Sequence, residues 1–130
     1  MARIIEERLN IRERAIQEAR EFAICASEKL GEITAVLFGS YARGDFNEWS
    51  DIDVLVVAKN LPKNPLQRLS LIDECVRRFP RVEVVIVTIE EFTKMRNKNP
   101  AIMEATQKGV TLIDGVGLLT ERTRSSHSGK

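Results

Sequence analysis

The first thirty residues carry an apolar stripe with the spacing of an amphipathic helix. Aliphatic side chains recur every three or four positions between residues 3 and 30, and Glu and Arg fill most of the others. The stripe consists of Ile5, Leu9, Ile16, Ala19, Ala23, Ala26 and Leu30. Arg12 interrupts it once, and Gly31 suits the end of the helix. The pattern predicts one long helix whose apolar side packs on the core of the chain or against a partner helix.

Four short apolar segments predict strands. Residues 33–38, 51–57 and 110–113 are rich in β-branched and aliphatic side chains and are bounded by turn-forming residues. Residues 82–87 are almost continuously apolar, which is typical of a strand buried on both faces.

Further helices are predicted between these strands. One covers residues 65–79, with Pro65 at its first position. Thr88 and Glu91 form a capping-box pattern that opens a short helix, and residues 100–108 form the last one. The alternation of helices and strands predicts an α/β fold with a single sheet of about four strands.

The composition argues for one domain and against several classes of protein. The chain has 130 residues, 43% of them hydrophobic, and a net charge of +1, which fits neither a disordered chain nor a general nucleic-acid binder. We expect a domain over residues 1–115 and a polar, disordered tail over residues 116–130. No run approaches the roughly 18 apolar residues of a membrane span, and charges interrupt the N-terminus where a secretory signal needs an apolar core. A cytoplasmic protein without a membrane or nucleic-acid partner is expected.

Cysteine and histidine contribute little to the candidate chemistry. Cys25 and Cys75 lack metal-ligand spacing and lie in partly apolar, helix-like runs, so we expect two buried thiols of a reducing compartment rather than a disulfide. His127 is the single histidine and lies in the polar tail, which argues against a histidine base or ligand.

Acidic residues gather around the second predicted strand. Residues 33–58 contain one basic and four acidic residues, for a net charge of −3, and residues 59–81 contain six basic and two acidic residues, for +4. Asp51 and Asp53 lie two positions apart in an apolar run, so on a strand their carboxylates share one face. A divalent cation such as Mg²⁺ or Mn²⁺ would relieve their repulsion. The alternative is that Asp51 caps a loop and Asp53 lies at an exposed strand end.

Glu83 is the one charged residue in the apolar run 82–87. A buried carboxylate is normally paired or bound to metal. If this strand lies beside the strand of Asp51 and Asp53, the three carboxylates could hold two divalent ions, an arrangement used for in-line displacement at phosphorus. The alternative is an edge-strand glutamate that faces solvent.

Gly39-Ser40 ends the first predicted strand abruptly. A glycine after a strand lets the backbone approach a ligand closely, and the following N–H groups and the Ser40 hydroxyl can donate to a phosphate. The segment is not a Walker-type loop, because the G-x-x-x-x-G-K-[ST] pattern is missing. Taken alone, Gly-Ser is also an ordinary turn.

The combination of these motifs resembles the signature of the nucleotidyltransferase superfamily that includes DNA polymerase beta and kanamycin nucleotidyltransferase. Gly39-Ser40 is followed after ten residues by Asp51-x-Asp53 and an apolar strand. The text GSYARGDFNEWSDIDVLVV is most similar to the single-domain minimal nucleotidyltransferases. The strong match covers residues 36–57 and extends weakly over residues 1–115.

The resemblance implies a nucleotidyltransferase fold with a mixed sheet and a role for each motif. Gly39 and Ser40 would hold the triphosphate of ATP or another nucleotide, and Asp51 and Asp53 would hold two Mg²⁺ ions. Glu83 would be the third carboxylate, which polarises the acceptor hydroxyl. Arg43 would contact phosphate or support the loop. The family usually has aspartate at the position of Glu83, and a displacement of about 1 Å could slow turnover roughly a hundredfold.

The resemblance also implies a protein partner. Relatives that extend nucleic acids or modify antibiotics carry further domains, so we expect another subunit or another protein to complete the acceptor site. Minimal nucleotidyltransferases resemble antitoxins that transfer AMP to a tyrosine of a HEPN-domain ribonuclease toxin. The long first helix and the basic segment around Lys59, Lys63 and Arg68 are candidate contact surfaces. A homo-oligomer is compatible with the same reasoning.

Two other functions remain open at this point. One is an interaction module that binds nucleotide weakly or not at all and neutralises its partner by complex formation. The other is a nucleotidyltransferase that acts on a small molecule.

Overall fold

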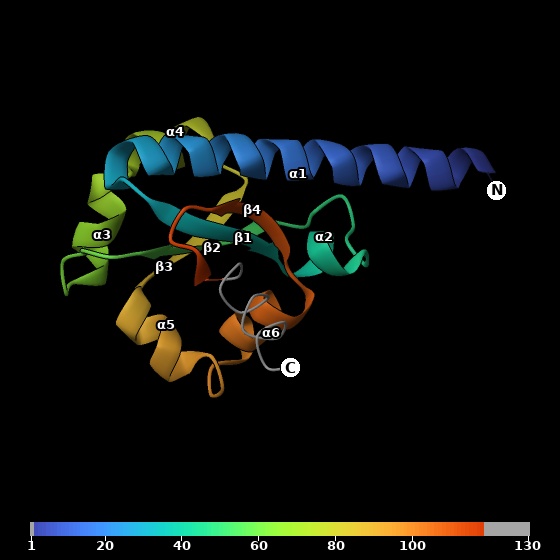
Figure 1. Ribbon diagram of the computed structural model, residues 1–130. Helices are drawn as coiled ribbons and strands as arrows, with labels where there is room; N and C mark the ends of the chain where they lie inside the picture. Colours follow the sequence, from blue (N-terminus) through green and yellow to red (C-terminus); the bar gives the residue numbers. More distant parts are fainter. Residues whose placement is uncertain (1, 119–130) are drawn as a thin grey trace.

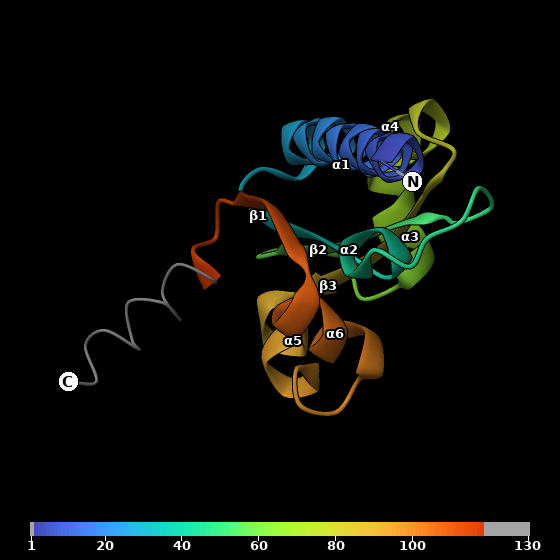
Figure 2. The same ribbon diagram turned by 90° about the vertical axis from the view of Figure 1, so that its right-hand side faces the viewer.

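A computed structural model describes residues 2–118 of the chain. In this part, helices cover both faces of one four-stranded sheet, as Figure 1 and Figure 2 show. The strands are β1 (Ile33–Phe38), β2 (Ile52–Ala58), β3 (Val82–Thr88) and β4 (Val110–Asp114). The helices are α1 (Ala2–Leu30), α2 (Ser40–Arg43), α3 (Pro65–Leu71), α4 (Asp73–Arg78), α5 (Ile89–Met95) and α6 (Pro100–Lys108). The predicted α/β fold with one sheet and a long N-terminal helix is confirmed, and most of the predicted tail lies outside the described residues.

The sheet is mixed, with the strand order β3-β2-β1-β4. β1 runs antiparallel to β2 and β4, whereas β2 and β3 run parallel and are connected by α3 and α4. In this register Asp53 lies beside Phe38 of β1 and beside Glu83 of β3. Residues in register on neighbouring strands point to the same face, so Asp53 and Glu83 share one face of the sheet.

Each face of the sheet has its own apolar core. α1 and α4 pack on one face, where they form the larger core with alternate residues of β1 and β2. α5 and α6 cover the other face, where Phe92 and Ile102 pack with Leu55 and Val57 of β2. Asp53 precedes Leu55 by two residues and therefore lies on the face covered by α5 and α6.

The first helix is longer than the core that it covers. Its second half is buried through Ile16, Ala19, Ala23 and Ala26, which confirms core packing for this part of the predicted stripe. Its first half projects past the sheet in Figure 1, and the side chains of Ile5 and Leu9 are 56% and 60% exposed. None of the helices in the described part of the chain is both long and apolar enough to cross a membrane.

The strand predicted to be buried on both faces is an edge strand. Val82, Ile86 and Val87 of β3 are buried, but Glu83 and Val85 are exposed to solvent. A strand at the edge has a neighbour on one side alone, and a continuous apolar run does not distinguish this position from a central one.

The helix predicted over residues 65–79 is divided at Ile72 into α3 and α4, and Arg68 of α3 is not on the expected basic surface. Ile72 is fully buried between α3 and α4. Arg68 is 6% exposed, and its Nη1 lies 2.7 Å from Oε1 of Glu91 at the capping box of α5. The expectation that Arg68 belongs to a contact surface is therefore wrong, because its guanidinium ties α3 to α5.

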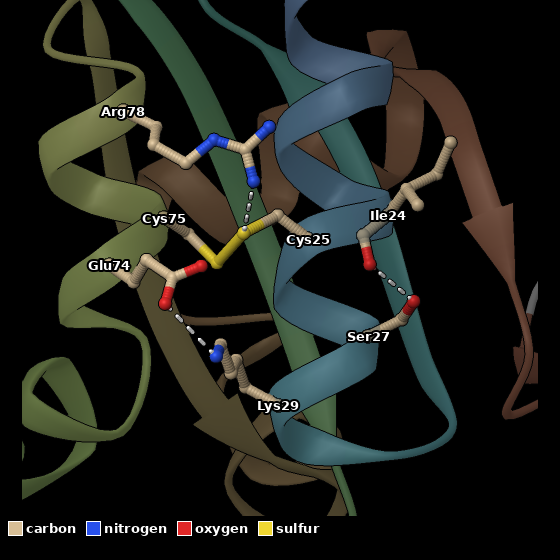
Figure 3. Close-up of a disulfide and its surroundings, with 7 residues drawn as sticks. All are labelled: Ile24, Cys25, Ser27, Lys29, Glu74, Cys75 and Arg78. Atoms are coloured by element: carbon tan, nitrogen blue, oxygen red, sulfur yellow. Dashed lines mark hydrogen bonds and ion pairs between the residues drawn. A yellow bond between two sulfur atoms is a disulfide. The ribbon is translucent and has the colours of Figure 1, made fainter.

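Cys25 of α1 and Cys75 of α4 form a disulfide, shown in Figure 3. Both residues are buried, and their Cα atoms are 5.8 Å apart. The expectation of two free thiols is wrong, because α1 and α4 pack side by side and bring together positions 50 residues apart. Lys29 of α1 also pairs with Glu74 of α4, so a surface contact accompanies the buried crosslink.

Candidate functional site

A single glycine turns the chain from β1 into α2. Gly39 has a φ of +76°, in the region that favours glycine over other residues. A Cβ at this position would also overlap Oδ2 of Asp53 on the neighbouring strand. Gly39 is therefore constrained by its backbone angle and by its neighbour, and the turn lies directly against the Asp53 carboxylate.

The predicted carboxylates are placed differently around this turn. Asp53 is half-buried, while Glu83 is exposed beside it in register on β3. Asp51 is exposed and precedes the first residue of β2, so it is not a strand residue. Glu83 is thus an edge-strand residue that faces solvent, as the alternative interpretation expected. The parallel pairing of β2 and β3 nevertheless places it next to Asp53.

The negative charges of these residues act on one another. The pKa of Asp53 is raised to about 6, chiefly by burial and then by the neighbouring carboxylates of Glu83, Asp51 and Glu104, in that order. Arg43 lowers the same pKa but does not offset the carboxylates. The site thus carries an excess of negative charge that is not balanced by the described side chains around Asp53.

Glu104 of α6 lies in the turn where a phosphate was expected. The backbone N–H of Gly39 donates to Oε2 of Glu104 at 2.8 Å, and Nη1 of Arg43 donates to both Glu104 carboxylate oxygens at 2.8 Å. Arg43 also pairs with Asp45 at 3.2 Å, and both acids raise its pKa, with the Asp45 hydrogen bond as the largest cause. Arg43 therefore holds the loop in place in this structure.

Two arginines of α1 fix the other end of α2. Nε of Arg12 donates to the Tyr41 carbonyl at 2.7 Å, and its Nη2 donates to the Ala42 carbonyl at 3.1 Å. Arg8 donates to the Gly44 carbonyl at 3.0 Å. The last carbonyls of a helix lack partners within the helix, so these bonds satisfy them and hold α2 against α1.

The Gly39 turn, α2, β2 and α6 line an open cavity of about 430 Å³, which is within the usual size range of ligand sites. Its lining includes Gly39, Ser40, Arg43, Asp53 and Glu104.

A second hollow of about 580 Å³ lies at the opposite ends of β2 and β3. It contains Lys59, Lys63 and Lys94 together with Glu90 and Glu91. It is larger than the first, but it lies away from the three predicted carboxylates. The smaller cavity is therefore the better candidate for chemistry at phosphorus.

Comparison with known proteins decides the family. The sequence model of the nucleotidyltransferase domain matches residues 19–109, which is more than half of the chain. The chain belongs to the nucleotidyltransferase domain family. The match begins within α1, so residues 2–18, including Arg8 and Arg12, lie outside the matched residues.

Curated relatives of this nucleotidyltransferase domain come from Methanocaldococcus jannaschii. "Putative protein adenylyltransferase MJ1305" is 46% identical over 61 residues, which cover 45% of this chain and 42% of that protein. "Putative protein adenylyltransferase MJ0604" is 41% identical over 63 residues, which cover 48% of this chain and 57% of that protein. The chain thus matches about half the length of these relatives.

Solved structures share the fold of the nucleotidyltransferase domain at low sequence identity. A Sulfolobus solfataricus protein is 22% identical, with a TM-score of 0.60 over 80% of this chain and 84% of the other. A chain from the Shewanella oneidensis complex of a tri-AMPylated HEPN toxin with its MNT antitoxin is 16% identical, with a TM-score of 0.52 over 88% and 87%. A chain from a toxin–antitoxin structure with AMP-PNP is 19% identical, with a TM-score of 0.52 over 83% and 87%.

The donor set of the nucleotidyltransferase domain fits Mg²⁺ that arrives with a nucleotide. Among the described residues, no three His, Cys, Asp or Glu side chains converge into a ready-made metal cage. Mg²⁺ is usually held by one or two carboxylates together with substrate phosphates rather than by an all-protein cage. Oxygen ligands from Asp53, whose pKa is raised by burial and by repulsion from its acidic neighbours, match this mode of binding.

Sequence reasoning missed Glu104 and the role of Arg12. Glu104 occupies a polar helical position 65 residues after Gly39, and helical periodicity does not reveal which strand end a helix faces. Arg12 did leave a signal, because it interrupts an otherwise apolar stripe at the point where the structure places α2.

Proposed function

We propose that this nucleotidyltransferase domain transfers AMP from ATP to a tyrosine hydroxyl of a HEPN-domain toxin and thereby acts as an antitoxin. The observation that carries the proposal is the direct contact of the Gly39 turn with Asp53 inside one cavity, with Glu83 in register beside Asp53. A backbone donor turn next to paired acids is what a metal-bound triphosphate requires.

Each residue has a role in this proposal. The Gly39 N–H and the Ser40 hydroxyl hold phosphate oxygens, and Asp51, Asp53 and Glu83 hold Mg²⁺, which neutralises charge on the phosphates when it is bound. Electrostatic stabilisation and alignment of the reactants supply most of the rate.

The reaction is a displacement at the α-phosphorus. The tyrosine oxygen forms a bond to this phosphorus, the bond to the oxygen bridging the α- and β-phosphates breaks, and pyrophosphate leaves. The hydroxyl proton passes to the Glu83 carboxylate, whose exposed position on the edge strand leaves room for an acceptor from a partner protein.

The comparisons support the substrate classes of this proposal. The Methanocaldococcus jannaschii relatives are named as protein adenylyltransferases, and structural neighbours come from toxin–antitoxin complexes, one with AMP-PNP and one with a tri-AMPylated HEPN toxin.

A binding module that neutralises its partner by complex formation alone is the second candidate. The observation that favours it is the pairing of Glu104 with the Gly39 N–H, which leaves this donor engaged by the protein itself. If the protein is such a module, the wild type and the Asp51→Asn/Asp53→Asn double variant should protect equally well against the toxin.

Transfer of label from α-³²P-ATP to a purified HEPN partner in the presence of Mg²⁺ tests the first candidate. We expect Asp53→Asn to abolish transfer while the protein stays folded. Asp73→Asn is the matched control, because Asp73 is an exposed residue of α4 away from the cavity, and this variant should transfer normally. Absence of transfer by the wild type, or equal transfer by Asp53→Asn, would contradict the proposal.

A further inference from the structure

The Gly39 turn already binds an anion, and that anion is a side chain of the same protein. Oε2 of Glu104 accepts the Gly39 N–H at 2.8 Å, and its carboxylate also accepts from Arg43 at 2.8 Å. A backbone amide and a guanidinium around one carboxylate are the donors that commonly bind a phosphate oxygen.

A phosphate at this turn and the Glu104 carboxylate exclude each other. The Gly39 N–H has one hydrogen, so a phosphate oxygen that accepts it takes the place of Oε2. Glu104 also adds its charge to those of Asp51, Asp53 and Glu83, and an incoming polyphosphate would be repelled by it.

The side chain of Glu104 can leave without unfolding the helix that carries it. α6 is anchored by Ile102 and Ala105 in the core and by Asn99, whose side chain accepts two backbone N–H groups at the start of the helix. The Glu104 side chain itself is 28% exposed, so it can turn toward solvent while the backbone of α6 stays in place.

We propose that Glu104 is an internal competitor for the phosphate position, so that nucleotide binds only as the Glu104 carboxylate leaves the Gly39 N–H. The inference rests on the proposed function, because it takes the Gly39 turn as the phosphate site. It makes Glu104 a residue that sets nucleotide affinity without contacting the nucleotide.

Titration calorimetry with Mg²⁺ and either ATP or inorganic tripolyphosphate tests the inference. Glu104→Gln keeps the shape of the side chain and removes its charge, and Glu104→Ala removes the competitor altogether. We expect Glu104→Ala to bind ATP about tenfold more tightly than the wild type, as the loss of one competing charge-assisted hydrogen bond implies. Glu104→Gln should gain less, because its amide oxygen can still accept from the Gly39 N–H. The affinity of each variant for tripolyphosphate should rise by the same factor as its affinity for ATP, because the competition involves only the phosphates.

Glu90→Gln is the matched control, since it removes one carboxylate charge from an exposed position on α5, and its affinity should equal that of the wild type. Thermal unfolding of each variant verifies the fold. If Glu104→Gln and Glu104→Ala bind ATP no more tightly than the wild type, this inference is overturned. The proposed function still stands in that case, provided that the wild type binds ATP. No binding of ATP by the wild type or by either variant overturns both.

Discussion

Gly39 is the residue on which the geometry of the site depends most closely. Its positive φ turns the chain from β1 into α2, and its missing side chain leaves space for the Asp53 carboxylate. The N–H of the same residue is the donor that Glu104 accepts. One position therefore sets the direction of the loop, its distance from the acid and its affinity for an anion.

Gly39→Ala should destabilise the protein and abolish nucleotide binding. A φ of +76° with a ψ of −155° is a backbone conformation that essentially only glycine adopts and that costs roughly 1–3 kcal/mol for other residues, and the overlap with Asp53 adds to this cost. Gly31→Ala is the matched control, because Gly31 has a φ of +85° with open space around it. Chemical denaturation should show a larger loss of stability in Gly39→Ala than in Gly31→Ala. Titration with ATP should show that Gly39→Ala no longer binds the nucleotide and that Gly31→Ala still does. Equal losses of stability in both variants would contradict the account.

The pair of Arg68 and Glu91 predicts a dependence of stability on pH. Hydrogen bonds from Arg68, above all, lower the pKa of Glu91 from 4.5 to about 2. A depressed folded-state pKa stabilises the protein above about pH 4.5, and this stabilisation is lost as the pH falls toward 2. Because the Glu91 side chain is 40% exposed, we discount the effect to about 1–2 kcal/mol.

Glu91→Gln should therefore be less stable than the wild type at pH 7 and equal to it near pH 2. Urea denaturation across this range measures the difference, and the exposed neighbour Glu90 supplies the control variant Glu90→Gln. A difference between Glu91→Gln and the wild type that does not change with pH would refute the assignment of the stabilisation to the ionised pair.

At the scale of elements, α1 links the core of the domain to the candidate site. Its second half packs on the sheet, and its first half carries Arg8 and Arg12, which hold the carbonyls at the end of α2. The disulfide between Cys25 and Cys75 then ties α1 to α4. The position of α2 thus depends on the first half of α1, which lies outside the residues that the family model matches.

Reduction of the disulfide should lower the free energy of unfolding by about 2–4 kcal/mol, since it releases a constraint between positions 50 residues apart in the unfolded chain. Thermal unfolding with and without a phosphine reductant measures this. The Cys25→Ser/Cys75→Ser variant should unfold at a lower temperature than the wild type and should not respond to the reductant. A wild type that is insensitive to the reductant, with the thiols shown to be reduced, would contradict the prediction.

At the scale of the whole molecule, the parts that could be predicted are those encoded by local pattern. Short apolar runs bounded by turn residues predicted all four strands, and the resemblance of Gly39-Ser40 and Asp51-x-Asp53 to a family signature indicated that Gly39 and Asp53 belong to one site. The contribution of Glu104, the role of Arg12 and the Cys25–Cys75 bond depend on which helices pack on which face of the sheet. Periodicity shows that a helix has an apolar side but does not name what that side meets.

The arrangement of the molecule concentrates its candidate chemistry at one end of the sheet. Asp53 and Glu83 lie on the face covered by α5 and α6, and Glu104 of α6 lines one cavity together with Asp53. The first half of α1 leaves Ile5 and Leu9 exposed beyond the sheet.

The most direct test of the account is a crystal structure of the protein with Mg²⁺ and AMP-PNP. The account predicts a phosphate oxygen on the Gly39 N–H in the place of Glu104, with a cation against Asp53. Nucleotide in the hollow beside Lys59 and Lys63, or nucleotide bound elsewhere with the bond between Gly39 and Glu104 intact, would contradict it.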